Sequence, residues 1–134
     1  MIRRRTLLLL VVALAGCRAR KDAAAMLPEN LAGKWRRTGS REVPAAQAPE
    51  PPVRSTVRRV VRADYAGPGA VEVTVYELSS NTAALDAVQR FQHAPGTVFF
   101  HKDEYFTVVR WQSADREDVG AFVRALEKHM AEVH

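Results

Sequence analysis

The chain has 134 residues, of which 47% are hydrophobic and 26% are charged, as in one globular domain and unlike a disordered or collagen-like protein. It holds 20 Lys and Arg residues against 15 Asp and Glu residues, a formal net charge of +5. Its single cysteine excludes an intramolecular disulfide, a zinc ribbon and a Cys-x-x-Cys redox centre.

The first residues have the composition of an export signal. Three arginines at positions 3–5 precede an apolar run from Leu7 to Leu14, and small residues follow the run. This run is shorter than the about 20 residues that cross a bilayer. The pattern therefore favours a cleaved signal over a transmembrane anchor.

The end of the signal, Leu14-Ala15-Gly16-Cys17, resembles the lipobox of bacterial lipoproteins. The resemblance implies that residues 1–16 are removed, that the Cys17 thiol receives a diacylglyceryl group and that acyl chains such as palmitate anchor the chain in the bilayer. The alternatives are a plain secretory signal and a buried structural cysteine. Lipoproteins retained in the inner membrane typically have Asp after the cysteine. Arg18 stands there instead, which implies the outer membrane, facing the periplasm.

The mature chain would divide into a basic and an acidic part. Residues 18–62 contain 11 basic and 4 acidic residues, whereas residues 63–134 contain 6 basic and 11 acidic residues. The basic part includes a short lipidated tether at residues 17–26. Residues 27–55 follow as a segment that carries Trp35 and then a Pro- and Ala-rich linker, with prolines at positions 44, 49, 51 and 52.

Residues 56–134 are predicted to form the folded domain. Residues 56–65 are rich in β-branched and basic residues, and Val71, Val73 and Val75 alternate with polar residues, which indicates two strands. Ser79, Ser80 and Asn81 can cap a helix that Ala94-Pro95-Gly96 ends. Residues 97–102 and 105–112 indicate a hairpin. Apolar residues spaced by three and four from position 119 to 133 then indicate a long amphipathic helix.

This order predicts an α+β fold in which a small antiparallel sheet of about four strands, in the order ββαββα, has both helices on one face. The second hairpin is apolar on both sides, so the far face needs a cover. The segment with Leu27, Leu31 and Trp35, spaced four apart, is the nearest candidate, and a second subunit or a partner is the other. The chain from Leu27-Pro28 through Gly33 and Trp35 to the last helix also resembles a group of uncharacterised exported bacterial domains, a resemblance that implies no activity.

No catalytic, phosphate-binding or metal-binding motif is evident. The densest polar cluster runs from His101 to Tyr105, and two adjacent ligands such as His101 and Glu104 do not complete a coordination shell. We therefore expect no metal site, and no cofactor besides the covalent lipid on Cys17.

Two surfaces are candidates for binding. Trp35, Phe106 and Trp111 are expected to form a contact or self-packing surface on the sheet. The basic residues Arg54, Arg58, Arg59 and Arg62 suit anionic lipid or lipopolysaccharide phosphate. The alternative is that these arginines protect an edge strand from pairing. Nucleic acid is not expected as a partner, because stacking aromatic residues do not alternate with the arginines and the export signal implies a location in the cell envelope.

These patterns predict a non-enzymatic interaction or accessory module of the cell envelope, which binds an envelope protein or a second copy of itself. The alternative is a small ligand-binding or hydrolytic domain that works in a crevice between the Pro-rich loop and the sheet.

Overall fold

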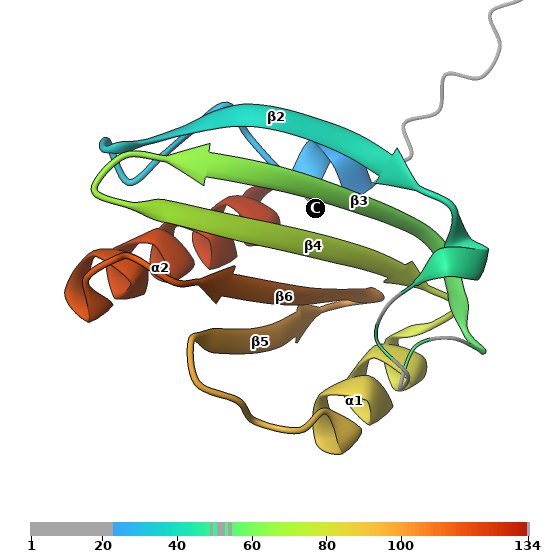
Figure 1. Ribbon diagram of the computed structural model, residues 1–134. Coiled ribbons are helices and arrows are strands. Elements are labelled where there is room, and N and C mark those ends of the chain that lie inside the picture. Colours follow the sequence, from blue (N-terminus) through green and yellow to red (C-terminus); the bar gives the residue numbers. More distant parts are fainter. Residues whose placement is uncertain (1–22, 49, 51–52, 54, 134) are drawn as a thin grey trace, which may run out of the picture.

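The computed structural model describes residues 23–48, 50, 53 and 55–133. Its elements are η1 (Ala23–Met26), β1 (Asn30–Leu31), β2 (Trp35–Val43), η2 (Ala45–Gln47), β3 (Val57–Ala66), β4 (Ala70–Leu78), α1 (Asn81–Arg90), β5 (Thr97–Lys102), β6 (Tyr105–Trp111) and α2 (Arg116–Glu132) (Figure 1). The predicted helices and the four predicted strands are present. The α+β class is therefore confirmed.

The sheet is larger than predicted. It has six antiparallel strands in the order β1-β2-β3-β4-β6-β5, so the expected count and order of four strands were wrong. The additional strands come from residues 30–43, which the sequence analysis placed before the folded domain. β2 pairs with β3 from Arg36, opposite Ala66, to Val43, opposite Val60. Most of β2 is solvent-exposed, so its sequence lacks the alternation of apolar residues that marks a half-buried strand.

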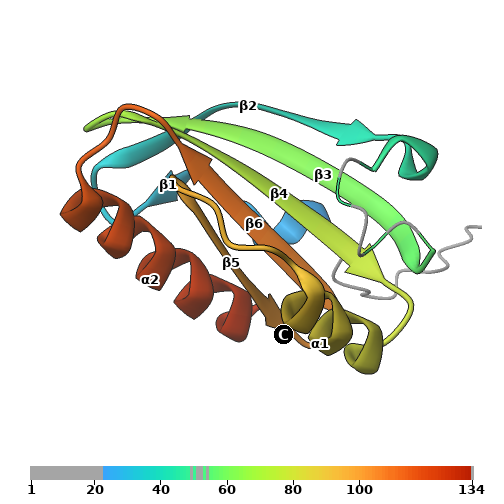
Figure 2. The same ribbon diagram turned by 60° about the horizontal axis from the view of Figure 1, so that its bottom comes forward.

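The two helices lie on opposite faces of the sheet, which corrects the prediction that they share one face. Val71, Val73 and Val75 of β4 belong to the core that packs against α2, whereas Tyr76 and Leu78 belong to the core beside α1. Alternate residues of a strand point to opposite faces. We call these the α2 face and the α1 face. In Figure 2, β5 lies between the two helices. The apolar residues on both sides of the second hairpin require this arrangement.

The α2 face is closed by α2 together with the segment before β2. Leu27, Leu31 and Trp35 are all buried there, so this segment does cover the sheet, although on the same face as α2. It forms β1 and a turn at Gly33, whose φ is +71°, instead of a helical turn. The Tyr65 hydroxyl donates to the carbonyl oxygen of Pro28 at 2.6 Å and ties the segment to β3.

The α1 face is covered at one end only. The Ser80 Oγ accepts a hydrogen bond from the Ala83 N–H at 3.0 Å, as the capping pattern predicted, and α1 buries its alanines against the sheet. Part of the predicted linker lies on the same face: Ala48, Glu50 and Val53 are buried. The rest of the α1 face is left open.

Candidate functional site

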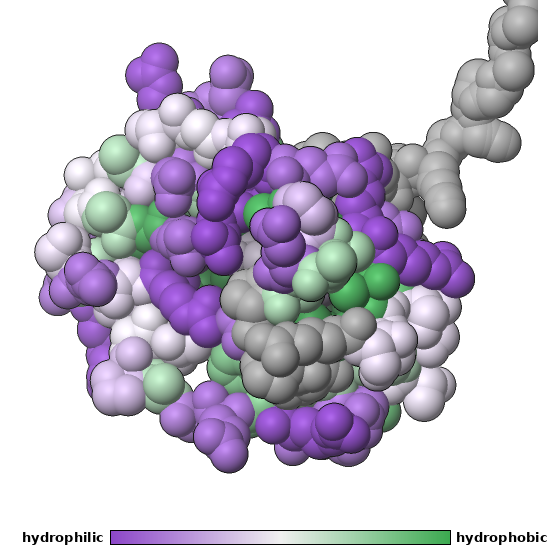
Figure 3. Space-filling view, turned by 45° about the vertical axis from the view of Figure 1, so that its right-hand side comes forward, coloured by the Kyte–Doolittle hydropathy of each residue, from purple (hydrophilic) through white to green (hydrophobic). Residues whose placement is uncertain are grey.

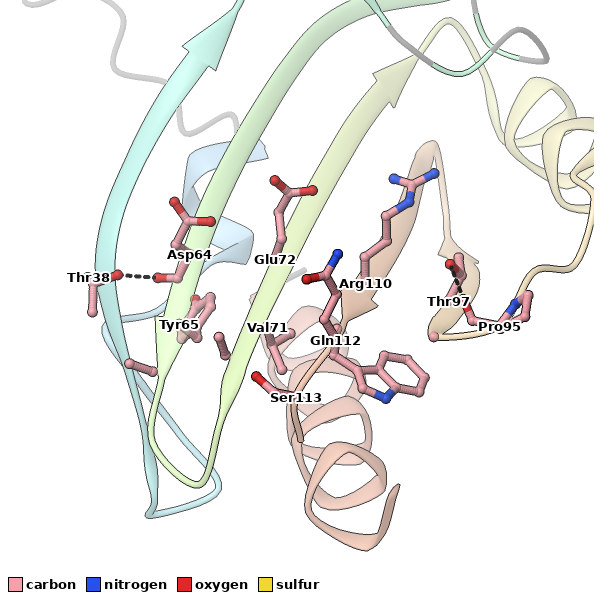
Figure 4. A pocket seen from close by; sticks show the side chains of 14 residues that line it. Thr38, Asp64, Tyr65, Val71, Glu72, Pro95, Thr97, Arg110, Gln112 and Ser113 are labelled. Atoms are coloured by element: carbon pink, nitrogen blue, oxygen red, sulfur yellow. Dashed lines mark hydrogen bonds between the residues drawn. The ribbon is translucent and has the colours of Figure 1, made fainter. Parts of the chain in front are cut away.

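The open part of the α1 face forms a groove of about 760 Å³. It crosses β3, β4 and β6 and reaches the loop before β5 (Figure 4). Its lining combines polar and apolar residues in similar measure and includes Thr38, Asp64, Glu72, Arg110 and Gln112, with Tyr65, Val71, Pro95, Thr97, Trp111 and Ser113 around them. Figure 3 shows that the side of the molecule next to η2 and α1 is mostly hydrophilic, with small hydrophobic patches.

The sheet register places charged side chains next to one another on the floor of this groove. Asp64 of β3 lies opposite Glu72 of β4, and Glu72 lies opposite Arg110 of β6. These positions alternate with the buried valines of the α2 face, so their side chains point into the groove. Figure 4 shows the two carboxylates and the guanidinium side by side on neighbouring strands.

The ion pairs in the groove neutralise these charges unequally. The Arg110 Nη2 lies 2.6 Å from the Glu50 Oε1, and Glu50 is 7% exposed. The Arg62 Nε lies 3.7 Å from the Glu72 Oε2 and donates to the Thr74 Oγ1 at 3.4 Å. Asp64 is exposed, and its carboxylate makes no ion pair with another residue that the structure describes. Asp64 therefore presents its negative charge to solvent or to a ligand.

A buried tyrosine lies next to the Arg110–Glu50 pair. Burial raises the pKa of Tyr76 well above its ordinary value, and the negative charge of Glu50 raises it further, whereas Arg110 and Arg62 act in the opposite direction. Tyr76 therefore stays neutral at all physiological pH values. Glu50, which comes from the predicted linker, thus interacts with both Tyr76 and Arg110 at the covered end of the α1 face.

A smaller pocket of about 460 Å³ continues the groove towards the end of α1. It shares Thr97 and Arg110 with the groove, and Glu50, Arg90 and His93 also line it. The His93 ring packs against Phe99 in a tilted arrangement, with 4.9 Å between the ring centroids. The groove thus has Asp64 and Glu72 at one end, and the smaller pocket at the other end adds Arg90 and His93 beside the Arg110–Glu50 pair.

The predicted contact surface of Trp35, Phe106 and Trp111 does not exist as one surface. Trp35 is 1% exposed in the core of the α2 face, where its ring lies 5.3 Å from that of Phe122. Phe106 is fully buried on the opposite face, against Tyr76 and Phe91. Trp111 is half-buried and lines the groove. Of the three, only Trp111 is partly exposed, and its side chain packs at the edge of the α2-face core.

The basic residues of β3 do not form one patch either. The Arg59 Nη2 lies 3.2 Å from the Glu42 Oε1, Arg62 pairs with Glu72 on the α1 face, and the exposed Arg58 donates to the Ser79 carbonyl oxygen at 3.4 Å. Arg54 lies outside the described residues. β3 is also a central strand, so the alternative that the arginines protect an edge is wrong.

The lipobox and Cys17 lie outside the described residues. In the part of the chain that the structure covers, no helix is long and apolar enough to cross a membrane. Within that same part, no three His, Cys, Asp or Glu side chains are grouped so that they could hold a metal ion. The His101–Tyr105 cluster forms the tight turn between β5 and β6, with Asp103 at φ 53°.

The sequence patterns do not single out the groove residues Asp64, Glu72, Arg110 and Glu50. A signal existed for Glu72, because the alternation of β4 already placed it opposite the buried valines. No local signal pointed to Glu50, which becomes buried only because the chain folds back onto the sheet. Asp64 and Arg110 join Glu72 through the register of three strands, which the sequence alone does not give.

Comparison with known proteins provides no template for this groove. No protein-family model, no curated protein and no solved structure matches the chain. A functional proposal must therefore be built from the residues and geometry described above.

Proposed function

We propose that the protein is a lipid-anchored lipoprotein of the bacterial envelope, held in the outer membrane facing the periplasm, and that its domain is a non-enzymatic binding module. Its contact site is the groove on the open part of the α1 face. The observation that supports this most directly is the row Asp64, Glu72 and Arg110, which is fixed on three paired strands and open to solvent.

The anchor is supported by the sequence at Leu14-Ala15-Gly16-Cys17. Two or three acyl chains bind a bilayer firmly, because each buried methylene group contributes about 0.8 kcal/mol. The first described element, η1, packs against β3, β4 and α2. The groove lies on the other face of the sheet. A tether that leaves from η1 would therefore leave the groove accessible to a partner.

The groove has the chemistry of a protein-binding surface. It offers carboxylates, a guanidinium and an amide on one rigid floor. Arginine is enriched where binding energy concentrates in protein interfaces. The mixed charges suit a partner segment that carries both basic and acidic side chains, and we propose an envelope protein as that partner.

A second candidate function is the binding of a small ligand in the 460 Å³ pocket. This pocket lies between the predicted linker, which contributes Glu50 to its lining, and the sheet, which contributes Arg110. Arg90 and His93 at its rim suit an anionic group. Binding of a small carboxylate or phosphate that raises the melting temperature of the purified protein, and that Arg90→Gln abolishes, would favour this function.

The anchor is tested by metabolic labelling with a fatty acid. The wild-type chain is expected to incorporate label and to fractionate with the outer membrane, whereas Cys17→Ser should lose both properties. Arg18→Asp should keep the label but move the protein to the inner membrane. Label that persists in Cys17→Ser would refute the lipoprotein assignment.

The groove is tested by crosslinking in cells. A photoreactive amino acid placed at Gln112, which lines the groove, should capture a defined envelope protein. Asp64→Lys should abolish the product, and Glu132→Lys, the same change at an exposed site on α2, should leave it intact. Equal capture in both variants would show that the groove is not the contact site.

A further inference from the structure

The outer strand β5 is an unprotected edge of the sheet. It is the last strand in the order β1-β2-β3-β4-β6-β5 and pairs only with β6. Its sequence, Thr-Val-Phe-Phe-His-Lys, has no proline, and its register with β6 runs without a bulge. Every residue of the strand is half-buried, so apolar side chains are partly open at this edge. Edges of this kind pair readily with another strand.

The opposite edge of the sheet is protected by several devices. β1 covers β2 at Trp35 and Arg36, and a bulge lies between Arg37 and Gly39. Beyond the bulge, exposed charged residues such as Arg41 and Glu42 follow. Bulges and charges at edges prevent strand addition. β5 has no bulge, and its one Lys is the last residue of the strand, Lys102.

The backbone of β5 offers hydrogen-bonding groups to a further strand. The Trp111 N–H donates to the Gly96 carbonyl at 3.0 Å, so this pair is hydrogen-bonded. In an antiparallel ladder hydrogen-bonded and non-hydrogen-bonded pairs alternate. Val98 and Phe100 therefore bond to β6, and the N–H and C=O groups of Thr97, Phe99 and His101 point outwards. No backbone bond to these outward groups is present among the described residues.

We propose that β5 pairs antiparallel with β5 of a second copy of this chain, centred on Phe99. This register joins the outward backbone groups of both strands: Phe99 meets its own counterpart, and Thr97 meets His101 of the second copy. Val98 then lies opposite Phe100 of the second copy, a β-branched residue against an aromatic one, which is a favourable cross-strand pair. The two sheets become continuous.

The helix beside β5 fits the same symmetry. A pocket of about 480 Å³ separates β5 from α2, and Val98, Trp111 and Val123 line it, with Arg116 and Arg124 at the α2 side. Glu127 follows Arg116 and Arg124 at helical spacing on this side. α2 runs along β5 in Figure 2. A two-fold axis through Phe99 makes the two α2 helices antiparallel, so that the arginines of one copy approach Glu127 of the other.

The dimer is compatible with the proposed lipid anchor, and this step rests on the proposed function. The two-fold axis of an antiparallel strand pair is perpendicular to the sheet, so both α2 faces lie on one side. η1 packs with the α2 face, in contact with α2. Both tethers would thus leave on the same side, towards one membrane. Both grooves would open on the other side.

The register is tested with cysteines in the full-length chain. A double variant, Thr97→Cys with His101→Cys, should form a disulfide-linked dimer in the periplasm, since the two positions face each other across the proposed pair. Each single variant should form none, because its cysteine lies four residues from its own counterpart in the other strand. The wild-type chain, whose cysteine is at position 17, measures the background.

Association itself is tested on the detergent-extracted chain by light scattering, which does not depend on anchoring. The wild type should have twice the mass of the monomer. His101→Pro removes an outward N–H without a bond to β6 and should weaken association at least 10-fold, whereas His101→Thr should not. A wild-type monomer up to roughly 100 μM, or a double-cysteine variant that links to a different protein, would overturn the proposal. Fatty-acid labelling and groove crosslinking are separate readouts, so failure here is distinguishable from failure of the proposed function.

Discussion

The two faces of the sheet are covered to different extents. The α2 face is filled by α2, η1 and the segment before β2, whose Trp35 packs on Phe122. The α1 face is covered at one end by α1 and by residues around Glu50, and is open over Asp64 and Glu72. Apolar side chains must be removed from water, whereas a row of charged ones can stay in it. The polarity of alternate strand residues therefore decides which part of the sheet is available for binding.

The largest effect is expected from the closed face. Phe122 is fully buried, and its ring lies 5.3 Å from that of Trp35 and 5.0 Å from that of Tyr65. Phe122→Ala should lower the free energy of unfolding by about 3–5 kcal/mol, as measured by urea denaturation. Phe99→Ala on the α1 face should cost less, about 1–2 kcal/mol, because Phe99 is only half-buried. Equal losses would contradict the difference between the faces.

The covered end of the α1 face should respond to loss of one carboxylate. Glu50→Gln removes the charge that holds Arg110 at 2.6 Å. We expect a loss of about 1–2 kcal/mol, moderated by the partial solvation of Arg110, and faster proteolysis between residues 44 and 56. Glu42→Gln is the matched control, because its pair with Arg59 is largely exposed and should contribute less than 1 kcal/mol. Unchanged proteolysis in Glu50→Gln would show that this contact does not hold the segment.

Two of the buried tyrosines, Tyr65 and Tyr76, predict instability at alkaline pH. Burial raises the pKa of Tyr65 on the α2 face and of Tyr76 on the α1 face above the ordinary value near 10. Above pH 10 the unfolded chain releases protons that the folded chain retains, so stability falls as pH rises. The expected slope is about 1.4 kcal/mol per pH unit for each tyrosine. Urea denaturation at pH 9 to 11 measures the onset of this loss, and Tyr65→Phe should remove the contribution of one tyrosine. A flat profile would contradict the burial of both rings.

Much of the fold could be predicted from local patterns. The Ser80 cap, the alternation around Val73 and the helical spacing from Val119 to Met130 each arise from neighbouring residues, and the structure confirms the elements they indicate. β2 was missed because it is mostly exposed and carries charges, and exposed strands have no apolar period. The prediction that both helices lie on one face was wrong, because the side of the sheet that each helix covers depends on which face of each strand it meets.

The candidate site depended still more on tertiary structure. Phe106 lies in a hairpin with apolar residues on both sides, and Trp35 lies in the segment expected to cover the sheet, so both are predicted near one surface. The structure buries them on opposite faces. The acidic and basic residues of the groove come from strands that are distant in sequence. Only the register brings Asp64, Glu72 and Arg110 together. Cys17 and its lipid remain a prediction from sequence.

The smallest effect on the free energy of unfolding is expected on the open floor of the groove, where it matters whether a substitution raises or lowers this energy. Asp64 lies opposite Glu72, and like charges at directly opposed strand positions are unfavourable. Asp64→Asn should therefore raise the free energy of unfolding by about 0.2–0.5 kcal/mol while it weakens capture of the partner at Gln112.

The matched control is Asp86→Asn on the outer side of α1. Asp86 lies 3.6 Å from Arg90 at i,i+4 spacing, so this substitution should lower stability by about 0.3 kcal/mol and leave capture unchanged. If the Asp64 carboxylate stabilised the fold, Asp64→Asn and Asp86→Asn would both lower the free energy of unfolding. Opposite signs, together with a loss of capture in Asp64→Asn alone, would show that Asp64 is retained for binding at a cost to stability.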